Sequence, residues 1–556
     1  MNVSWIERLT HSRILYFLIV SSVTVCGVAV RLIGLGNGLW LDEAWVANSV
    51  RADSVASMFH YDAWLQTTPP LMLLLVRVTV RSLGMSNYTF RLVPLLFGLM
   101  AVVCMFFLVR RVLSPLYALP AWILLVFSPV AIFYSKSLKQ YSAELAAVTV
   151  ILLVCILYLE RPTLRRFCLL VAVVAVSLPM AYPVALFLPG ISMVVWLAAN
   201  QTGNSATAPA RRRWEGLIRA LILDAVAGGI LIGLYLFFLR PNTSPSLHAY
   251  FNEGREGFGF FRAAMNNDYT LLWLLPLPAP VSLRGRLLVF GAVGLLIFVG
   301  LILAWVQYRN GTRKWLQVQV ICGLPVLLLF VCNGFMLYPV TNRTVLFLLP
   351  AVILLLLCSL QLIFDFVLQR SRREWLKPTR DLVMVCATLV LIVNGAWTQP
   401  WGTFHVPEED VEGAVSFLHA NVQSGDVLWV HSTCAEAFKL YAAMTGWSNA
   451  PAQFGHTGYP CCPRGVQVGG GVSNEKDVRS DLDRVPASFS GKVWLLYNTR
   501  ADHWAWVGAD EPKIMEDVFR ERGCLQKQTP TFHHIGVSYF DCTAAHAQLL
   551  KGDGVR

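Results

Sequence analysis

The sequence predicts a polytopic α-helical membrane protein with an extracytoplasmic α/β domain at its C-terminal end. Hydrophobic residues make up 56% of the 556 residues and charged residues only 14%, and the mean hydropathy is +0.56. Apolar runs long enough to cross a bilayer as helices recur up to about residue 398. After that residue, short apolar runs alternate with turn residues. Soluble domains do not have this composition, and lipid-exposed backbone must form helices.

The apolar runs predict about eleven transmembrane helices. The first run follows a short basic start, but it is too long for a signal peptide and lacks a small-residue cleavage site, which favours a permanent anchor. The predicted spans are residues 14–33, 92–109, 116–133, 142–159, 167–181, 184–199, 219–239, 287–307, 318–337, 344–367 and 381–398.

The basic residues predict the orientation of the chain. A net charge of +12 would suggest nucleic acid in a soluble protein, but these Lys and Arg residues lie in short loops between apolar runs. With a cytoplasmic N-terminus, every cluster falls on the cytoplasmic side, as the positive-inside rule requires. We therefore expect a multi-pass protein of the bacterial inner membrane and no nucleic-acid partner. The clusters are Arg110–Arg111, Arg161–Arg166, Arg211–Arg213, Arg309–Lys314 and Arg370–Arg380.

The same orientation places the tail outside the cytoplasm and divides the chain into a membrane domain, 1–398, and a soluble α/β domain, 399–556. Residues 427–430, 493–497 and 535–539 read as strands. Residues 411–421 and 435–444 read as helices. The size of the tail is ordinary for one domain.

Five of the 13 cysteines lie in this tail, where an oxidising compartment would permit disulfides. We expect Cys524 to pair with Cys542, because a turn near Thr529 and Pro530 would bring two strands together. A metal site is the alternative, but the adjacent Cys461 and Cys462 lack the Cys-x-x-Cys spacing of zinc sites.

Two adjacent acids, Asp42 and Glu43, follow the first span on the predicted outer side. Ionisable groups near membrane depth usually have a function. On a helix the two side chains would point about 100° apart, so one of them would do the chemistry. The alternative is equally plausible from this segment alone: Asp42 caps a helix that begins at Ala44, and Glu43 favours the positive end of its dipole.

Three cations also lie on the predicted outer side, against the positive-inside trend. Lys136 and Lys139 are in a short loop, and Arg343 is beside a proline-containing turn. An anionic ligand such as a phosphate would explain them, and Arg binds phosphate bidentately. The alternative for the lysines is snorkelling to lipid headgroups.

Other outer segments supply candidate substrate contacts. Arg91 stands at the entrance of the second span, Tyr141 follows Lys139, and Arg255 belongs to the glycine- and aromatic-rich loop 240–286. That loop is either a lid over a site or a plain connection.

Together these segments resemble the GT-C membrane glycosyltransferases, in the branch that contains protein O-mannosyltransferases and aminoarabinose transferases of lipid A. Leu41–Ala44 looks like the catalytic loop of that family, and Thr68–Leu71 resembles its His-Pro-Pro-Leu element, with Thr in place of His. Tyr134–Ser142 is similar to a family segment in which Lys139 stands for the usual Arg. Asn342–Pro350 resembles an Arg-Tyr segment that ends in Pro, with Thr344 in place of Tyr.

The resemblance implies a donor sugar on a polyprenyl phosphate, an extracytoplasmic acceptor and inversion at the anomeric carbon. A single displacement needs one carboxylate to take the acceptor proton, and Asp42 is the candidate base. Cations stabilise the phosphate leaving group, a role for Lys136, Lys139 and Arg343. Glu43 would orient Asp42, bind an acceptor hydroxyl or assist a divalent cation. No metal ligand set is predicted, and the acceptor is left open among glycan, lipid and protein.

The main alternative function is a transporter or flippase of a lipid-linked or soluble solute. It predicts a site near the bilayer midplane with broken helices and repeats, whereas the candidate acids lie in an outer loop. A scaffold or sensor is a further alternative, but it leaves the outer acids and cations unexplained.

Overall fold

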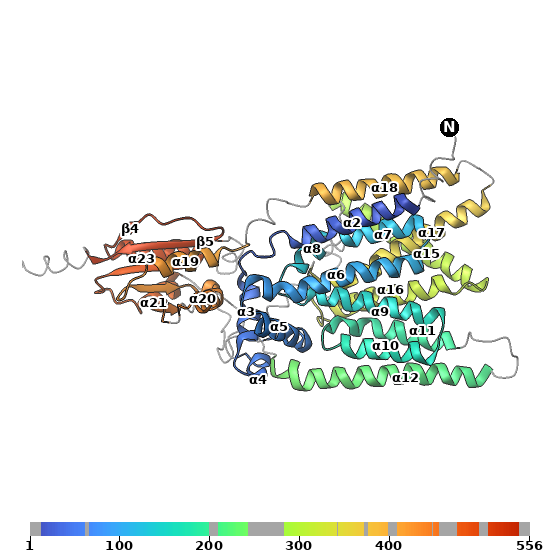
Figure 1. Cartoon of the computed structure of the whole chain (residues 1–556), viewed down its shortest axis with the longest axis horizontal. Helices are drawn as coiled ribbons and strands as arrows, with labels where there is room; N and C mark the ends of the chain where they lie inside the picture. Colours follow the sequence, from blue (N-terminus) through green and yellow to red (C-terminus); the bar gives the residue numbers. More distant parts are fainter. Residues whose placement is uncertain are drawn as a thin grey trace, which may run out of the picture.

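The computed structural model consists of a long helical bundle and a smaller α/β unit that lie end to end (Figure 1). It describes residues 13–61, 66–199, 209–242, 283–341, 343–371, 376–398, 408–447, 449–454, 475–499 and 510–543. Arg255, Asn342, Cys461 and Cys462, with most of the loop 240–286, lie outside the described residues. So does the predicted boundary near residue 399, which stays a prediction.

Each of the predicted spans coincides with helix in the bundle. By length and composition, six helices of the described chain could cross a membrane, or seven with one bent pair. The bundle helices are α2 (Arg13–Leu32), α6 (Asn87–Val112), α7 (Pro115–Val126), α8 (Pro129–Ser135), α9 (Tyr141–Glu160), α10 (Leu164–Ser177), α11 (Leu188–Ala199), α12 (Pro209–Leu234), α15 (Leu283–Arg309), α16 (Lys314–Gly334), α17 (Leu349–Arg370) and α18 (Leu376–Thr398).

The predicted span 116–133 is broken into α7 and α8, which meet at an angle of 51°. Pro129 disfavours helical backbone at the residue before it, and the Ser128 side chain instead caps α8 by accepting from the Ala131 N–H. The span 184–199 also departs from a regular helix, because it begins as a 3₁₀ turn, η1 (Tyr182–Phe187).

Basic loops gather at the end of the bundle that is remote from the α/β unit. Arg111 forms an ion pair with Glu160 at 2.8 Å, and the Nζ of Lys314 donates to the backbone oxygen of Arg111. Three predicted cytoplasmic loops therefore meet at one end, in agreement with the grouping of their charges.

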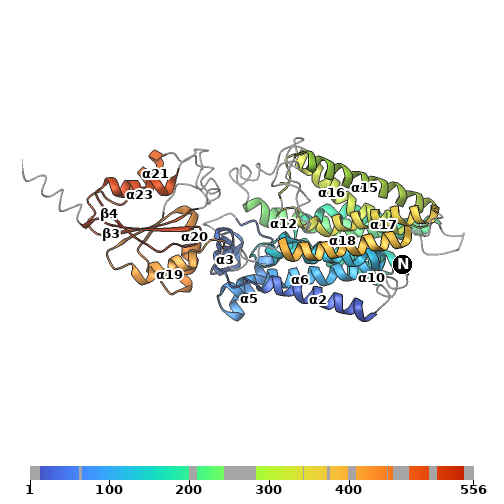
Figure 2. The same ribbon diagram turned by 90° about the horizontal axis from the view of Figure 1, so that it is seen from above.

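Three short helices cover the opposite end, next to the α/β unit (Figures 1 and 2). They are α3 (Leu41–Arg51), α4 (Val55–Phe59) and α5 (Pro70–Leu83). Pro70 occupies the first turn of α5, where a missing N–H costs nothing. The apolar segment 71–80, which is too short to span a bilayer, is thus a helix that packs beside α6 and α3.

The α/β unit, residues 408–543, is a five-stranded sheet with helices on both faces (Figure 2). The strand order is β2-β1-β3-β5-β4, with β1 parallel to β2 and β3, and β5 antiparallel to β3 and β4. The predicted strands and helices are confirmed. The strands are β1 (Val427–Val430), β2 (Ala452–Phe454), β3 (Lys492–Asn498), β4 (Leu525–Lys527) and β5 (Ile535–Asp541), and the helices are α19 (Val411–Asn421), α20 (Ser432–Met444), α21 (Glu475–Leu482) and α23 (Glu511–Glu521).

The alternation of side chains along the central strands builds two cores. Val493 and Leu495 face α21 and α23, whereas Trp494 and Leu496 face α19 and α20. The second core does not stop at the sheet: the same buried cluster includes residues of α3, α5 and α6. The α/β unit is therefore packed onto the bundle through a continuous apolar interior.

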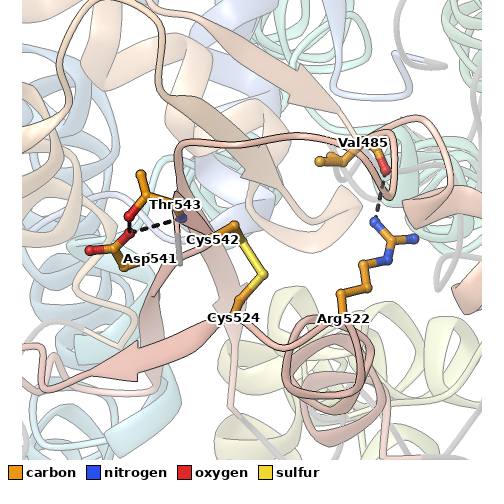
Figure 3. The surroundings of a disulfide bond; sticks show 6 residues. All are labelled: Val485, Arg522, Cys524, Asp541, Cys542 and Thr543. Atoms are coloured by element: carbon orange, nitrogen blue, oxygen red, sulfur yellow. Dashed lines mark hydrogen bonds between the residues drawn. A yellow bond between two sulfur atoms is a disulfide. The ribbon is translucent and has the colours of Figure 1, made fainter. Parts of the chain in front are cut away.

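The predicted disulfide between Cys524 and Cys542 is present (Figure 3). It joins the residue before β4 to the residue after β5, whose sequence separation is 18. Beside it, Arg522 donates to the backbone oxygen of Val485 at 2.7 Å.

Replacing Cys542 with Ser is expected to lower the free energy of unfolding of the α/β unit by about 3 kcal/mol, because the bridge restricts the unfolded chain. The measurement is the temperature at which protease cleaves this unit, with and without reductant. Cys168→Ser is the control, since Cys168 is a free, exposed cysteine. Equal cleavage temperatures for Cys542→Ser and the control would contradict the prediction.

Candidate active site

Helix α3 begins one residue before the two acids. Its N-cap is Trp40, so Asp42 and Glu43 are the second and third residues of the helix. The alternative in which Asp42 caps a helix beginning at Ala44 is therefore wrong. As residues of one helical turn they point in different directions, and they have different partners.

Glu43 is fully buried and forms an ion pair with Arg91, which is 5% exposed. The Nε of Arg91 donates to Glu43 Oε1 at 2.9 Å and its Nη2 donates to Oε2 at 2.5 Å. The backbone N–H of Leu138 also donates to Oε1. The Glu43 carboxylate thus joins α3 to α6 and to the loop that carries Lys139.

Arg91 also holds the loop between α2 and α3. Its Nη1 donates to the backbone oxygens of Leu35 and Asn37, and its Nη2 donates to that of Gly38 at 3.0 Å. With the two bonds to Glu43, all five N–H groups of the guanidinium have protein acceptors. Arg91 fixes the path of the chain into α3.

Asp42 lies on the other side of α3, between two cations. Its Oδ2 is 3.4 Å from Lys139 Nζ and 3.3 Å from Arg343 Nη1. The side chains are 12%, 14% and 28% exposed for Asp42, Lys139 and Arg343. The three residues come from α3, the α8–α9 loop and the loop before η7 (Leu346–Leu348). In sequence, Lys139 is 97 residues from Asp42 and Arg343 is 301 residues from it, so the fold brings these groups together.

This cluster carries a net positive charge and is largely withdrawn from water. Burial lowers the pKa of Lys139, and the Asp42 carboxylate opposes part of that shift. Chemically, the arrangement offers one carboxylate that can accept a proton and two cations that can bind an anion beside it.

The Lys136 ammonium group has a different partner from that of Lys139. Its Nζ donates to the backbone oxygen of Ile33 at 3.0 Å. Burial and the neighbouring Arg31 and Arg91 lower the pKa of Lys136 to about 7. Tyr141 begins α9 just after Lys139 and its ring packs edge-on against Tyr134, with centroids 4.7 Å apart.

Three residues at or near the site have no role predicted from the sequence. Glu409 and Tyr441, from the α/β unit, bind backbone N–H groups at the start of α3, and nothing in their sequence context indicated this. Glu144, on α9, is 3% exposed, and its Oε2 has no hydrogen-bond partner among the described residues. An acid within an apolar span was the signal for Glu144.

Within the described ranges, no group of three or more His, Cys, Asp or Glu side chains is arranged to hold a metal ion. Glu43, for which assistance to a divalent cation was one expectation, has its carboxylate engaged by Arg91 and Leu138.

No protein-family model and no curated protein sequence matches this chain. The structure is similar to that of ArnT from Cupriavidus metallidurans bound to undecaprenyl phosphate, with a TM-score of 0.50 and 12% identity over 94% of this chain and 97% of that chain. Also similar is the oligosaccharyltransferase AglB from Archaeoglobus fulgidus with an inhibitory peptide and dolichol-phosphate, with a TM-score of 0.49 and 12% identity over 89% and 71% of the two chains. Both are GT-C fold glycosyltransferases. The likeness to ArnT shows the fold, and the predicted GT-C-like fold class is confirmed.

Proposed function

We propose that this protein is a membrane glycosyltransferase that moves a sugar from a polyprenyl-phosphate donor to an acceptor at the end of the bundle next to the α/β unit, with inversion. The observation that carries the proposal is Asp42, a single carboxylate held between Lys139 and Arg343. The fold supports it, because the ArnT structure of the same fold is bound to undecaprenyl phosphate. By the predicted orientation, this end is extracytoplasmic.

The cluster suits a single displacement. An acceptor hydroxyl attacks the anomeric carbon, the bond from that carbon to the phosphate oxygen breaks, and Asp42 takes the hydroxyl proton. The lipid phosphate leaves with one more negative charge than it had in the donor. Lys139 and Arg343 are placed to stabilise that charge, in a site where screening by water is weak.

In this proposal Glu43 and Arg91 position the catalytic loop, because both are buried and occupied by protein partners. Lys136 supports the loop through its hydrogen bond to Ile33 O. The buried Tyr141 ring, next to the cluster in sequence, stays a candidate for contact with the sugar, and the candidate Arg255 lies outside the described residues.

The test is transfer in reconstituted vesicles that contain a panel of polyprenyl-phosphate sugars. Loss of sugar from one donor lipid, with the wild-type protein only, would support the proposal and identify the donor. Movement of an intact lipid or solute across the vesicle membrane, with no donor consumed, would contradict it and favour the transporter.

Replacing Lys139 or Arg343 with Ala is expected to weaken donor affinity about 10- to 100-fold, the loss expected for a charge-assisted hydrogen bond to phosphate. Acceptor affinity should change much less. Binding of the donor to purified variants measures the effect. Arg81→Ala is a matched control, since Arg81 is an exposed cation of α5 at the same end of the bundle. Donor affinity equal to that of this control would contradict the phosphate role.

The lowered pKa of Lys139 predicts a pH dependence. Lys139 should lose its proton, and donor affinity should fall, at a lower pH than for an ordinary lysine, whose pKa is about 10.4. The neighbouring charges are Asp42, Arg343 and Glu43. Lys139→Arg keeps the charge at all these pH values, so it should move the fall in affinity to higher pH. Identical pH profiles for the wild type and Lys139→Arg would show that another group titrates.

A further inference from the structure

We propose that the α/β unit is part of the active centre, because Glu409 and Tyr441 position the start of α3 and so place Asp42 between its two cations. This rests on the proposed function, in which Asp42 is the base. Both are positioning residues, since each acts on Asp42 through the backbone of α3.

The start of α3 supplies only part of its own capping, in that the Glu43 carboxylate accepts from the Trp40 N–H at 3.4 Å. The first N–H groups of a helix have no acceptor within the helix, and the N-cap Trp40 makes no side-chain capping bond. The N–H of Leu41, immediately before Asp42, donates to Glu409 Oε2 at 3.0 Å. A carboxylate at this position also favours the positive end of the helix dipole. Glu409, a residue of the α/β unit, therefore caps the Leu41 N–H of α3.

Glu409 is itself fixed in place. It is 1% exposed, and its Oε1 accepts a hydrogen bond of 2.8 Å from Asn498 Nδ2 at the end of β3. The position of Leu41 is thereby tied to the central strand of the sheet. Movement of the sheet relative to the bundle would be transmitted to the residue next to Asp42.

Tyr441 makes a second connection. Its hydroxyl accepts from the Leu39 N–H at 2.5 Å and donates to Asn87 Oδ1 at 3.1 Å. Asn87 Nδ2 in turn donates to Gly36 O and to Glu412 Oε2. One buried network thus joins α20 and α19 of the α/β unit to the start of α6 and to the loop that leads into α3.

The far part of α3 is attached as well. Asn48 Nδ2 donates to both the backbone oxygen and the carboxylate of Glu436, at 2.8 and 2.9 Å. The apolar interior is continuous across the contact, since Leu39, Ala44 and Phe438 belong to one buried cluster. The α/β unit therefore holds α3 along its length, and the two contacts nearest Asp42 are those of Glu409 and Tyr441. A displacement of about 1 Å at a reacting group can cost about 100-fold in rate.

Glu409→Ala and Tyr441→Phe, in the full chain, test the proposal. Both variants are expected to lower kcat about 10- to 100-fold, with donor KM within about twofold of the wild type, because Lys139 and Arg343 are untouched. Glu409→Gln keeps one acceptor oxygen and should recover part of the lost kcat. Tyr497→Phe is the matched control, because the Tyr497 hydroxyl bonds to Glu516 of α23 and Ser538 of β5, both within the α/β unit.

A purely structural role would lower the amount of folded protein or the thermal midpoint and leave kcat of the folded fraction unchanged. That result, or an equal fall in kcat for Tyr497→Phe, would overturn the proposal. No recovery in Glu409→Gln over Glu409→Ala would also count against the assigned hydrogen bond.

Hydrogen exchange supplies a readout that does not depend on the reaction. The amides of residues 36–51 should exchange faster in Glu409→Ala and Tyr441→Phe, while those of Tyr497→Phe match the wild type. Faster exchange in these variants, when the wild type itself transfers no sugar, would contradict the proposed function but support the attachment of α3 by the α/β unit. Unchanged exchange, with transfer intact, would overturn the positioning role alone.

Discussion

Replacing Asp42 with Asn is expected to reduce sugar transfer about 100- to 10,000-fold, the usual contribution of a general base. Asn has the shape of Asp but cannot take a proton from the acceptor hydroxyl. The fold should be retained, since Asn fills the same space between Lys139 and Arg343 as Asp42, whose side chain is 12% exposed. Single-turnover transfer with saturating donor and acceptor measures the chemical step.

Donor binding in Asp42→Asn should be unchanged or tighter. In the wild type the Asp42 carboxylate lies within ion-pair distance of Lys139 and Arg343, and it competes with an incoming phosphate for both cations. In Asp42→Asn this competition is removed, so both cations are available to bind the phosphate. Slow chemistry combined with intact donor affinity is therefore the expected signature of a lost base, whereas weak donor binding would show that Asp42 organises the site instead.

Asp53→Asn is the matched control. Asp53 lies in the same loop region between the first two spans and is exposed, and its backbone oxygen, rather than its carboxylate, accepts from Arg77 and Arg81. It should transfer at the wild-type rate. Equal transfer by Asp42→Asn and Asp53→Asn would remove Asp42 as the base.

Much of the fold follows from hydrophobicity alone, because apolar length fixes where helices cross a bilayer. The positions of the spans, the strands near Val427, Val493 and Ile535, and the Cys524–Cys542 pair were all predictable from local sequence. Hydrophobicity does not predict the breaks inside apolar runs. Ser128 and Pro129 carry a local signal for one of them, which the surrounding hydrophobicity concealed.

The candidate site was predictable as a set of residues at one end, but their division of labour was not. Helical spacing predicts that the Asp42 and Glu43 side chains point in different directions. It does not predict which of the two faces the protein interior. That depends on Arg91, whose acceptors include three backbone oxygens, and backbone acceptors have no signature in residue type. Lys136 and Lys139 look equivalent in sequence, yet one ammonium binds Ile33 O and the other lies beside Asp42.

The contribution of the α/β unit was beyond local reasoning. Glu409 and Tyr441 are 368 and 402 residues from the backbone groups that they bind. An acid before a helix and a tyrosine within one are common in any soluble domain. Only the packing of the two units makes them partners of α3.

Replacing Arg91 with Lys is the other change with a large expected effect. The charge is kept, but five N–H donors become three on a narrow ammonium that cannot bridge both oxygens of Glu43 and reach Gly38 and Leu35. Each buried acceptor left without a partner costs about 1 to 3 kcal/mol, so we expect a loss of about 3 kcal/mol or more in the free energy of unfolding. The temperature of unfolding in detergent measures this.

Arg111→Lys is the matched control for Arg91→Lys, because Arg111 also pairs with a glutamate, Glu160, but at an exposed position where both side chains are about 40% accessible. Such pairs contribute about 0 to 1 kcal/mol, and the variant should unfold and transfer like the wild type. In folded Arg91→Lys, transfer should fall with donor affinity nearly intact, since the change displaces the loop into α3 and leaves Lys139 and Arg343 in place. If Arg91→Lys instead kept its stability and lost donor affinity, Arg91 would contact the substrate directly, as its place at the start of α6 first suggested.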